Sequence, residues 1–385
     1  MTSKAAKLLA TASIVTLTAV GGAPAWAAGT TAGTPIVNNV NVNYSVGGVA
    51  QNQLTASNTT YVDRLVTMTM SNAATTTSVA PGQTQAVVAY KIVNNSNAPI
   101  GLGLSTAAQA SGGSAAHGGN TNYLPANTTI WVNTNGSASS PTFDPANSKQ
   151  VSFVGTLAAD ATQYVFVRAD TAGTQVNGDI GGVLLQAQAL EPSATTTAGA
   201  VMQQNTGARV LPTSGNTVAN TIFGDAAGAT VSGSTDNLND GKVTAANDYT
   251  VSAPVLTVTK LSSIIWDPIT KSGTNAKAVP GATILYCVVV ANSGTGAPAS
   301  NITISDPLPS VVAWPTGTPP SGISVQPGMY LNGSTTVTNG VTSCNLDGTL
   351  TAGGWNGGSP GTVTGTIASL PTGAAKTLYF TATIN

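Results

Sequence analysis

The sequence has very few charged residues. They make up 6% of the 385 residues, whereas an ordinary soluble domain carries about 25%. The formal net charge is −1, so the chain offers no basic surface for nucleic acid or anionic lipid. Charges on edge strands normally prevent sheets from pairing with one another. Because 28–62, 92–143 and 307–346 contain no charged residue, either the fold covers its sheet edges or the protein associates through them.

Residue types that commonly carry catalysis are also scarce. His117 is the only histidine and Glu191 the only glutamate. A Ser-His-Asp triad or a catalytic carboxylate pair is therefore not expected. His117 falls in the glycine- and serine-rich stretch 111–119, where we expect a solvated loop with no acid or nucleophile nearby. We predict that the protein is not an enzyme.

The start of the chain has the pattern of a secretory signal peptide. Two lysines precede an uncharged apolar stretch at about 8–20, and an Ala-Trp-Ala motif follows at 25–27. The apolar stretch is shorter than the roughly 18 to 20 residues that span a bilayer, and the motif is typical of cleavage sites. We predict a signal peptide at 1–27 and a mature chain of 28–385 that is secreted, at the cell surface or in the extracellular space. No membrane span is expected in the mature chain.

Cys287 and Cys344 are the only cysteines. Export compartments are oxidising, so two cysteines of an exported protein usually bond to each other. We predict a Cys287–Cys344 disulfide that holds the proline-rich stretch 307–343 against a core strand.

Alternation of apolar and polar residues is typical of strands along most of the chain. Val40, Val42, Tyr44 and Val46 alternate with polar residues and run into a Gly-Gly turn, which predicts a half-buried strand. We expect no amphipathic helix in the mature chain. Similar strand-like runs, separated by Gly, Pro, Asn and Ser, predict a β-sandwich: 64–71, 85–93, 128–132, 163–168, 182–190, 255–260, 283–291, 301–305 and 377–384.

The sequence contains an internal repeat. Pro81-Gly82 recurs as Pro280-Gly281, and Pro99 as Pro298, both 199 residues later. A β-branched strand precedes each Pro-Gly pair, and a long apolar strand follows it. Two domains of one fold in series explain this pattern.

The second copy of the repeat resembles a known family. Leu256–Lys260, Val279–Gly281, Tyr286–Asn292 and Asn301–Pro309 are similar to the conserved repeat domain of unknown function, number eleven in its series. The resemblance covers 253–385, and the stretch at about 60–195 resembles a diverged relative that lacks Asp-Pro-Leu-Pro. It implies immunoglobulin-like sandwiches of bacterial or archaeal surface proteins, without known catalysis.

We therefore predict an all-β protein with two immunoglobulin-like β-sandwich domains in tandem. The expected order is a signal peptide, an amino-terminal strand or hairpin arm at 28–58, a first sandwich at 59–195, a polar linker at 196–252 and a second sandwich at 253–385.

The expected linker is rich in side-chain oxygens. Its carboxylates, together with Asn237 and Asn239, have the chemistry that Ca²⁺ prefers. The standard calcium-loop pattern is not met, since Leu238 stands where an oxygen is needed and no glutamate closes the loop. Two interpretations stay open, a solvated connector and a calcium site, and no other cofactor is expected. The candidate ligands are Asp225, Asp236, Asp240 and Asp248.

These observations predict a structural or adhesive component of the bacterial cell surface or extracellular matrix that associates with itself. In the sharper version, the uncharged arm Gly33–Gln53 adds as a strand to a neighbouring subunit and builds a filament. Pairing of this strand within its own domain is the other interpretation. The alternative function is a monomeric binding module for carbohydrate or a protein partner, with exposed tryptophans as the sugar platform.

Overall fold

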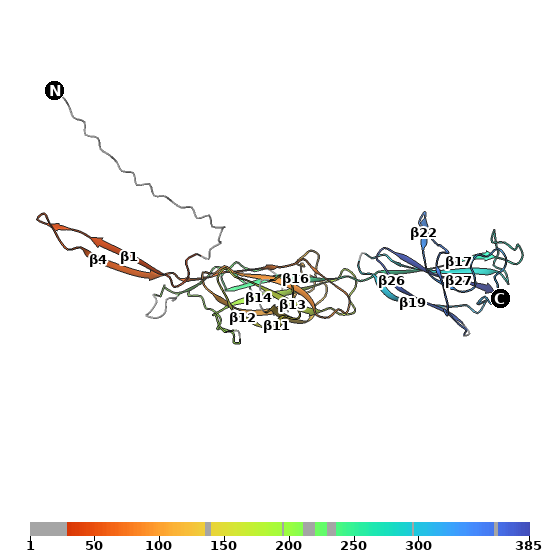
Figure 1. Ribbon diagram of the computed structural model, residues 1–385, viewed down its shortest axis with the longest axis horizontal. Coiled ribbons are helices and arrows are strands. Elements are labelled where there is room, and N and C mark those ends of the chain that lie inside the picture. The colour runs from red at the N-terminus through yellow and green to blue at the C-terminus, as the bar shows by residue number, and fades with distance from the viewer. Residues whose placement is uncertain are drawn as a thin grey trace, which may run out of the picture.

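The computed structural model describes residues 29–134, 140–194, 196–210, 220–228, 236–294, 296–357 and 361–385. The signal peptide predicted at 1–27 lies outside these residues. All secondary-structure elements within these residues are β-strands, and the predicted all-β class is confirmed. In the same ranges no helix has the length and apolar character that crossing a bilayer requires. The strands form a projecting hairpin and two bodies that follow one another along the long axis (Figure 1).

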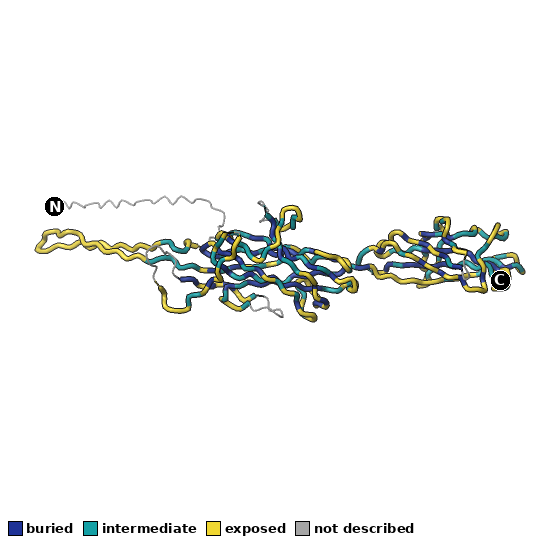
Figure 2. Tube along the Cα trace, turned by 90° about the horizontal axis from the view of Figure 1, so that it is seen from below, coloured by how far each residue is buried: buried dark blue, intermediate teal, exposed yellow. Residues whose placement is uncertain are grey.

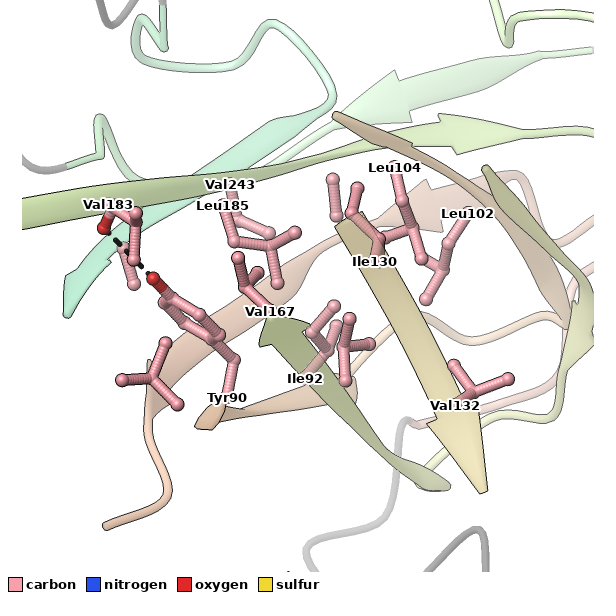
Figure 3. Close-up of a cluster of buried hydrophobic side chains, with 14 of the residues drawn as sticks. Tyr90, Ile92, Leu102, Leu104, Ile130, Val132, Val167, Val183, Leu185 and Val243 are labelled. Carbon is pink, nitrogen blue, oxygen red and sulfur yellow. Dashed lines mark hydrogen bonds between the residues drawn. The ribbon is translucent and has the colours of Figure 1, made fainter. Parts of the chain in front are cut away.

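The body nearer the hairpin is a sandwich of two five-stranded sheets. Side chains that alternate along the strands point inward and form one buried cluster, in which Tyr90, Ile92 and Val167 lie against Leu185 and Val243 (Figure 3). One sheet has the order β11 (Ser148–Gln150), β10 (Ala126–Asn133), β13 (Thr162–Asp170), β8 (Ala86–Asn94), β6 (Met68–Asn72). The other has the order β12 (Phe153–Leu157), β9 (Ile100–Ala108), β14 (Ile180–Leu190), β16 (Lys242–Val251), β7 (Thr77–Val79).

The expected linker 196–252 differs from the structure. Its residues 242–251 form β16, which lies inside a sheet between β14 and β7. A second part forms β15 (Thr221–Phe223), which pairs in parallel with β5 (Arg64–Val66). β16 reads as polar in the sequence because it carries Asn247 and Asp248, yet both are buried. The Asn247 side chain donates a hydrogen bond to the Ala89 carbonyl at 3.1 Å. This bond offsets the hydration that the buried amide loses.

The other body also packs two sheets face to face. Its core contains Val288, Val290, Ile367, Leu378 and Phe380. The larger sheet has the order β17 (Leu256–Trp266), β18 (Thr283–Asn292), β27 (Ala375–Ile384), β21 (Met329–Gly333), β24 (Thr349–Thr351), with β20 (Val312–Ala313) also joined to β27. The smaller sheet has the order β19 (Ala299–Pro307), β26 (Thr362–Leu370), β25 (Trp355–Asn356). A small hairpin, β22 (Thr335–Thr338) and β23 (Val341–Cys344), stands apart from both sheets.

The internal repeat has a structural counterpart. Gly82 and Gly281 both have left-handed backbone, with φ of 75° and 85°, as a tight turn before the long strand requires. β8 ends on Asn94 and β18 ends on Asn292, and both side chains are buried. Each amide donates at 3.1 Å to the carbonyl of an alanine four or five residues on, Ala98 or Ala297. The same polar bridge therefore closes the same strand in both bodies.

The projecting hairpin consists of β1 (Pro35–Val42) and β4 (Leu54–Tyr61), with the short strands β2 (Ser45–Val46) and β3 (Val49–Ala50) at its tip. It extends from the end of the molecule opposite the carboxyl terminus (Figure 1). Almost all of it is exposed (Figure 2).

Candidate functional site

The two faces of the hairpin differ in chemistry. β1 and β4 pair antiparallel without a register shift, so residues opposite each other share a face. One face, which we call the apolar face, carries four large apolar side chains together with Ala56, two asparagines and a threonine. The opposite face carries five Asn, Ser or Thr residues together with a proline, Val37 and Tyr61. The apolar residues of the first face are Ile36, Val40, Val42 and Leu54, and each is 47 to 57% exposed.

The predicted arm residues all belong to this hairpin. Val40 and Val42 lie in β1, Val46 lies in β2, and Tyr44 lies between these strands. The sequence analysis expected a strand or hairpin arm, and the structure shows a hairpin, because β1 pairs with β4. The expected half-burial was wrong, since these four side chains are 45 to 62% exposed. The pairing leaves the outer edges of β1 and β4 without a neighbouring strand in the described part of the chain.

Hydrogen bonds fix the base of the hairpin to the body. Ala32 donates to the Asn97 carbonyl at 3.0 Å, and the Arg209 guanidinium donates to the Tyr61 carbonyl at 2.7 Å. Asp63 accepts hydrogen bonds from Asn220 and Arg209. Partial burial works to raise the pKa of Asp63, but these two donors outweigh it and hold the pKa below its usual value. The hairpin is thus anchored at one end and presented to solvent along the rest of its length.

Three of the four predicted calcium ligands meet in space. Oxygens of Asp225, Asp236 and Asp240 lie within 4.8 Å of one another. Asp225 is buried and accepts hydrogen bonds from the backbone of Asp240 and Gly241. Burial raises the pKa of Asp225 and of Asp236, and the Asp240 carboxylate adds to both shifts. The arrangement has the oxygen chemistry of a calcium site, which stays a prediction.

The fourth predicted ligand, Asp248, lies elsewhere. Its buried carboxylate contacts His117, with 3.0 Å between Oδ1 and the ring Nδ1 and 2.8 Å between Oδ2 and the backbone nitrogen. The other ring nitrogen of His117 lies 3.2 Å from the Ala74 carbonyl. The expectation that His117 has no acid nearby was therefore wrong. The sequence hid this pair because 131 residues separate its members. Both ring nitrogens of His117 have contacts inside the fold, so the pair ties the loop containing His117 to β16.

Cys287 and Cys344 are joined by a disulfide, with 6.5 Å between their Cα atoms, as predicted. Cys287 lies on β18 and Cys344 ends β23. The bond therefore staples the β22–β23 hairpin to the larger sheet.

The tryptophans do not form an open platform. Trp314 stacks on Trp355 with 4.9 Å between ring centroids and also contacts Phe380 at 5.8 Å. Trp131 contacts Phe143 and is half-buried. A cavity of about 350 Å³ lies beside Trp314, lined mainly by Pro, Thr and Gly together with Ile323 and Val325.

No family model and no curated protein matches this chain. The resemblance of 253–385 to repeat domain number eleven is therefore not supported by the family comparison. Three solved structures are similar only at a low level. A chain named BspA_C_WT is 8% identical with a TM-score of 0.24, over 82% of this chain and 91% of that one. The collagen adhesin from S. aureus is 11% identical with a TM-score of 0.19, over 83% of this chain and 81% of that one. A protein described as membrane anchored from Corynebacterium diphtheriae is 11% identical with a TM-score of 0.17, over 91% of this chain and 89% of that one. These similarities are too low to carry an argument about function.

Proposed function

We propose that this protein is a structural subunit of an extracellular filament on the bacterial surface or in its matrix, and that hairpin β1–β4 joins each copy to the next by strand addition. The observation that carries the proposal is the apolar face of a hairpin that projects from the body, with no described segment covering it. The disulfide is consistent with an oxidising, extracellular location.

On physical grounds, the hairpin needs a partner that covers it. An isolated two-stranded hairpin is marginally stable in water, and a third strand or a packed face is needed for independent stability. Val40 and Val42 are about half exposed, so covering them removes apolar surface from water and stabilises whatever covers them. The outer edges of β1 and β4 also present rows of backbone donors and acceptors to a further strand.

The usual barrier to edge pairing is missing. Residues 28–62 contain no Asp, Glu, Lys or Arg, although charges on edge strands are the common protection against association. Neutral strands that meet lose no charge solvation and suffer no repulsion. Self-association through the hairpin therefore meets little electrostatic opposition.

A matched pair of variants tests the proposal. Val40 and Val37 lie three positions apart in β1 with nearly equal exposure, 53% and 54%, but Val40 lies on the apolar face and Val37 on the opposite face. Val40→Lys should raise the protein concentration needed for assembly by about tenfold or more, because roughly 1 kcal/mol of burial is lost and an ammonium group must also leave water. Val37→Lys should change it by about twofold at most. Sedimentation velocity and electron microscopy over a concentration series measure both.

Two results would refute the proposal. One is a wild-type chain of 28–385 that stays monomeric at high concentration, and the other is assembly that Val40→Lys leaves intact. The monomeric result would favour the alternative, a binding module for carbohydrate or a protein partner. For such a binding module, the first candidate ligand site is the cavity beside Trp314.

A further inference from the structure

We infer that the hairpin of one copy adds to the outer edge of β17 in a second copy. This inference rests on the proposed function and names the strand that receives the hairpin. It follows from the lengths of the edge strands, the chemistry of their faces and their places in the molecule.

Few edge strands of the two bodies are long enough to pair with the eight-residue strands of the hairpin. Among the described sheets, β17 has eleven residues and β19 has nine, whereas the other edge strands have five or fewer. β19 is the poorer template. Asn301 in it has left-handed backbone with φ of 53°, and its last residue, Pro307, has no N–H to donate. β17 pairs with β18 without interruption from Leu256 to Ile264, so its edge is regular over a length that matches β1.

The inner face of β17 extends the sandwich core, and its first part is left uncovered by the described residues. Val258 lies opposite Val290 of β18, and the two side chains therefore share a face. Val290 is 1% exposed, but Val258 is 67% exposed and Leu256 is 41% exposed. The cause is a difference in width, since the larger sheet has six strands and the facing sheet only three. The facing sheet reaches β17 only at Lys260, which contacts Asp306 of β19, so the core ends in an open apolar strip at Leu256 and Val258.

The apolar face of the hairpin fits this strip. A strand added beside β17 continues the larger sheet, and one of its faces then lies beside Val258 over the same open side. Ile36, Val40 and Val42 provide an apolar face on β1. The hairpin also supplies a second strand, β4, which shields the new edge of β1 with Leu54 and Ala56 on the same face. Docking would bring the two apolar surfaces side by side, so that cross-strand contacts remove part of each from water.

The single charge of β17 does not oppose this contact. Lys260 is the only charged residue in the strand, and its Nζ lies 2.6 Å from Oδ1 of Asp306 on β19. The same ammonium lies 4.9 Å from the centre of the Tyr286 ring. Asp306 is buried. Because the charge of Lys260 is compensated and held toward the smaller sheet, an incoming strand meets no unpaired charge.

The placement predicts an open chain of subunits. The hairpin projects from one end of the elongated molecule, and β17 belongs to the body at the other end (Figure 1). A contact between different surfaces of two copies generates a filament when the rotation does not close a ring. Each copy would give one hairpin and receive one.

A second matched pair tests the assignment of β17. Val258 and Val341 are 67% and 68% exposed, and both are strand residues of the same body. Val258→Lys places a charge in the open strip and should raise the concentration needed for assembly by about tenfold or more. Val341→Lys on the small hairpin should leave it within about twofold. Circular dichroism and thermal unfolding of the two variants show whether they are equally folded.

Mixing separates this inference from the proposed function. Val40→Lys has an intact β17 but a blocked hairpin, and Val258→Lys has the reverse. Each alone should be monomeric, whereas an equimolar mixture should form dimers and no longer species, because one compatible contact exists between them. Suppose that Val40→Lys blocks assembly, as the proposed function requires. Filaments formed by folded Val258→Lys, or an equimolar mixture that stays monomeric, would then overturn the assignment to β17 and leave the proposed function standing. Wild-type behaviour of both variants would overturn the proposed function itself.

Discussion

Reduction of the disulfide should destabilise the body that contains it by several kcal/mol. Cys287 and Cys344 are separated by 57 residues, and closing a loop of that length in the unfolded chain corresponds to about 4 kcal/mol at 25 °C in the chain-entropy account. For a body of this size the loss should lower the unfolding midpoint in guanidinium chloride by about 1 M. The bond also fixes the β22–β23 hairpin, so its loss should loosen that hairpin before the sheets separate.

Tryptophan fluorescence can follow this body by itself. Trp266, Trp314 and Trp355 belong to it, and Trp131 belongs to the other body. In a Trp131→Phe background, fluorescence of the described part of the chain therefore reports the disulfide-containing body. Oxidised protein, reduced protein and a double Cys→Ala variant should be compared. Equal unfolding midpoints for the oxidised and reduced protein would refute the reasoning. If the reductant also lowered the midpoint of the double Cys→Ala variant, the destabilisation would come from something other than loss of the disulfide.

Three further predictions concern polar groups within the bodies. A hydrogen bond from the backbone of Thr270 is the main cause that lowers the pKa of Asp267 from 3.8 to about 2. The ionised carboxylate therefore stabilises the fold fully above about pH 4, and its contribution should disappear as pH falls from about 4 to about 2. Thermal unfolding of wild type and Asp267→Asn over this pH range measures the effect. Tyr90→Phe should cost about 2 kcal/mol in chemical unfolding, because the buried Tyr90 hydroxyl donates to the Val183 carbonyl at 2.9 Å (Figure 3). Asp236→Asn should raise the melting temperature at pH 7 in EDTA, because burial and neighbouring carboxylates raise the pKa of Asp236 and its ionised form therefore destabilises the fold. The increase in melting temperature should shrink as pH falls toward about 4.

Each of these predictions has a control or a contradicting result. A wild-type midpoint that falls no more steeply than that of Asp267→Asn below pH 4 would contradict the first. For the second, Tyr164→Phe on the half-buried side of β13 should have a much smaller effect than Tyr90→Phe. For the third, added Ca²⁺ should reverse the order of wild type and Asp236→Asn if the cluster is a calcium site, because the variant has lost a ligand. Calcium that shifts both proteins equally would exclude that site.

The sequence predicted features that local patterns encode. Alternation of apolar and polar residues predicted the strand that contains Val40 and Val42. The presence of only two cysteines in a chain expected to be exported predicted the disulfide between them. The repeated Pro-Gly pair was found in the sequence, and Gly82 and Gly281 both adopt the left-handed backbone that such a turn needs. In each case, residues close in sequence or rare in composition contain the necessary information.

Features that depend on distant contacts could not be predicted in this way. A hairpin arm was one of the expectations for 28–58, but β4 has no apolar alternation, so its bounds and its register against β1 could not be predicted. β16 contains Asn247 and Asp248 and was expected to be part of a linker, but partners on distant segments satisfy both side chains. The open strip at Val258 likewise depends on the unequal widths of two sheets, which no local pattern of β17 records.

Hydrogen exchange of the mature chain at low and high protein concentration tests the central claim most directly. If hairpins join the copies, amides of 35–61 should become protected as concentration rises, and those of 256–264 should become protected in parallel. Amides of the β22–β23 hairpin at 335–344 should exchange at an unchanged rate. Exchange in 35–61 that stays equally fast at every concentration, in samples that nonetheless assemble, would contradict the account.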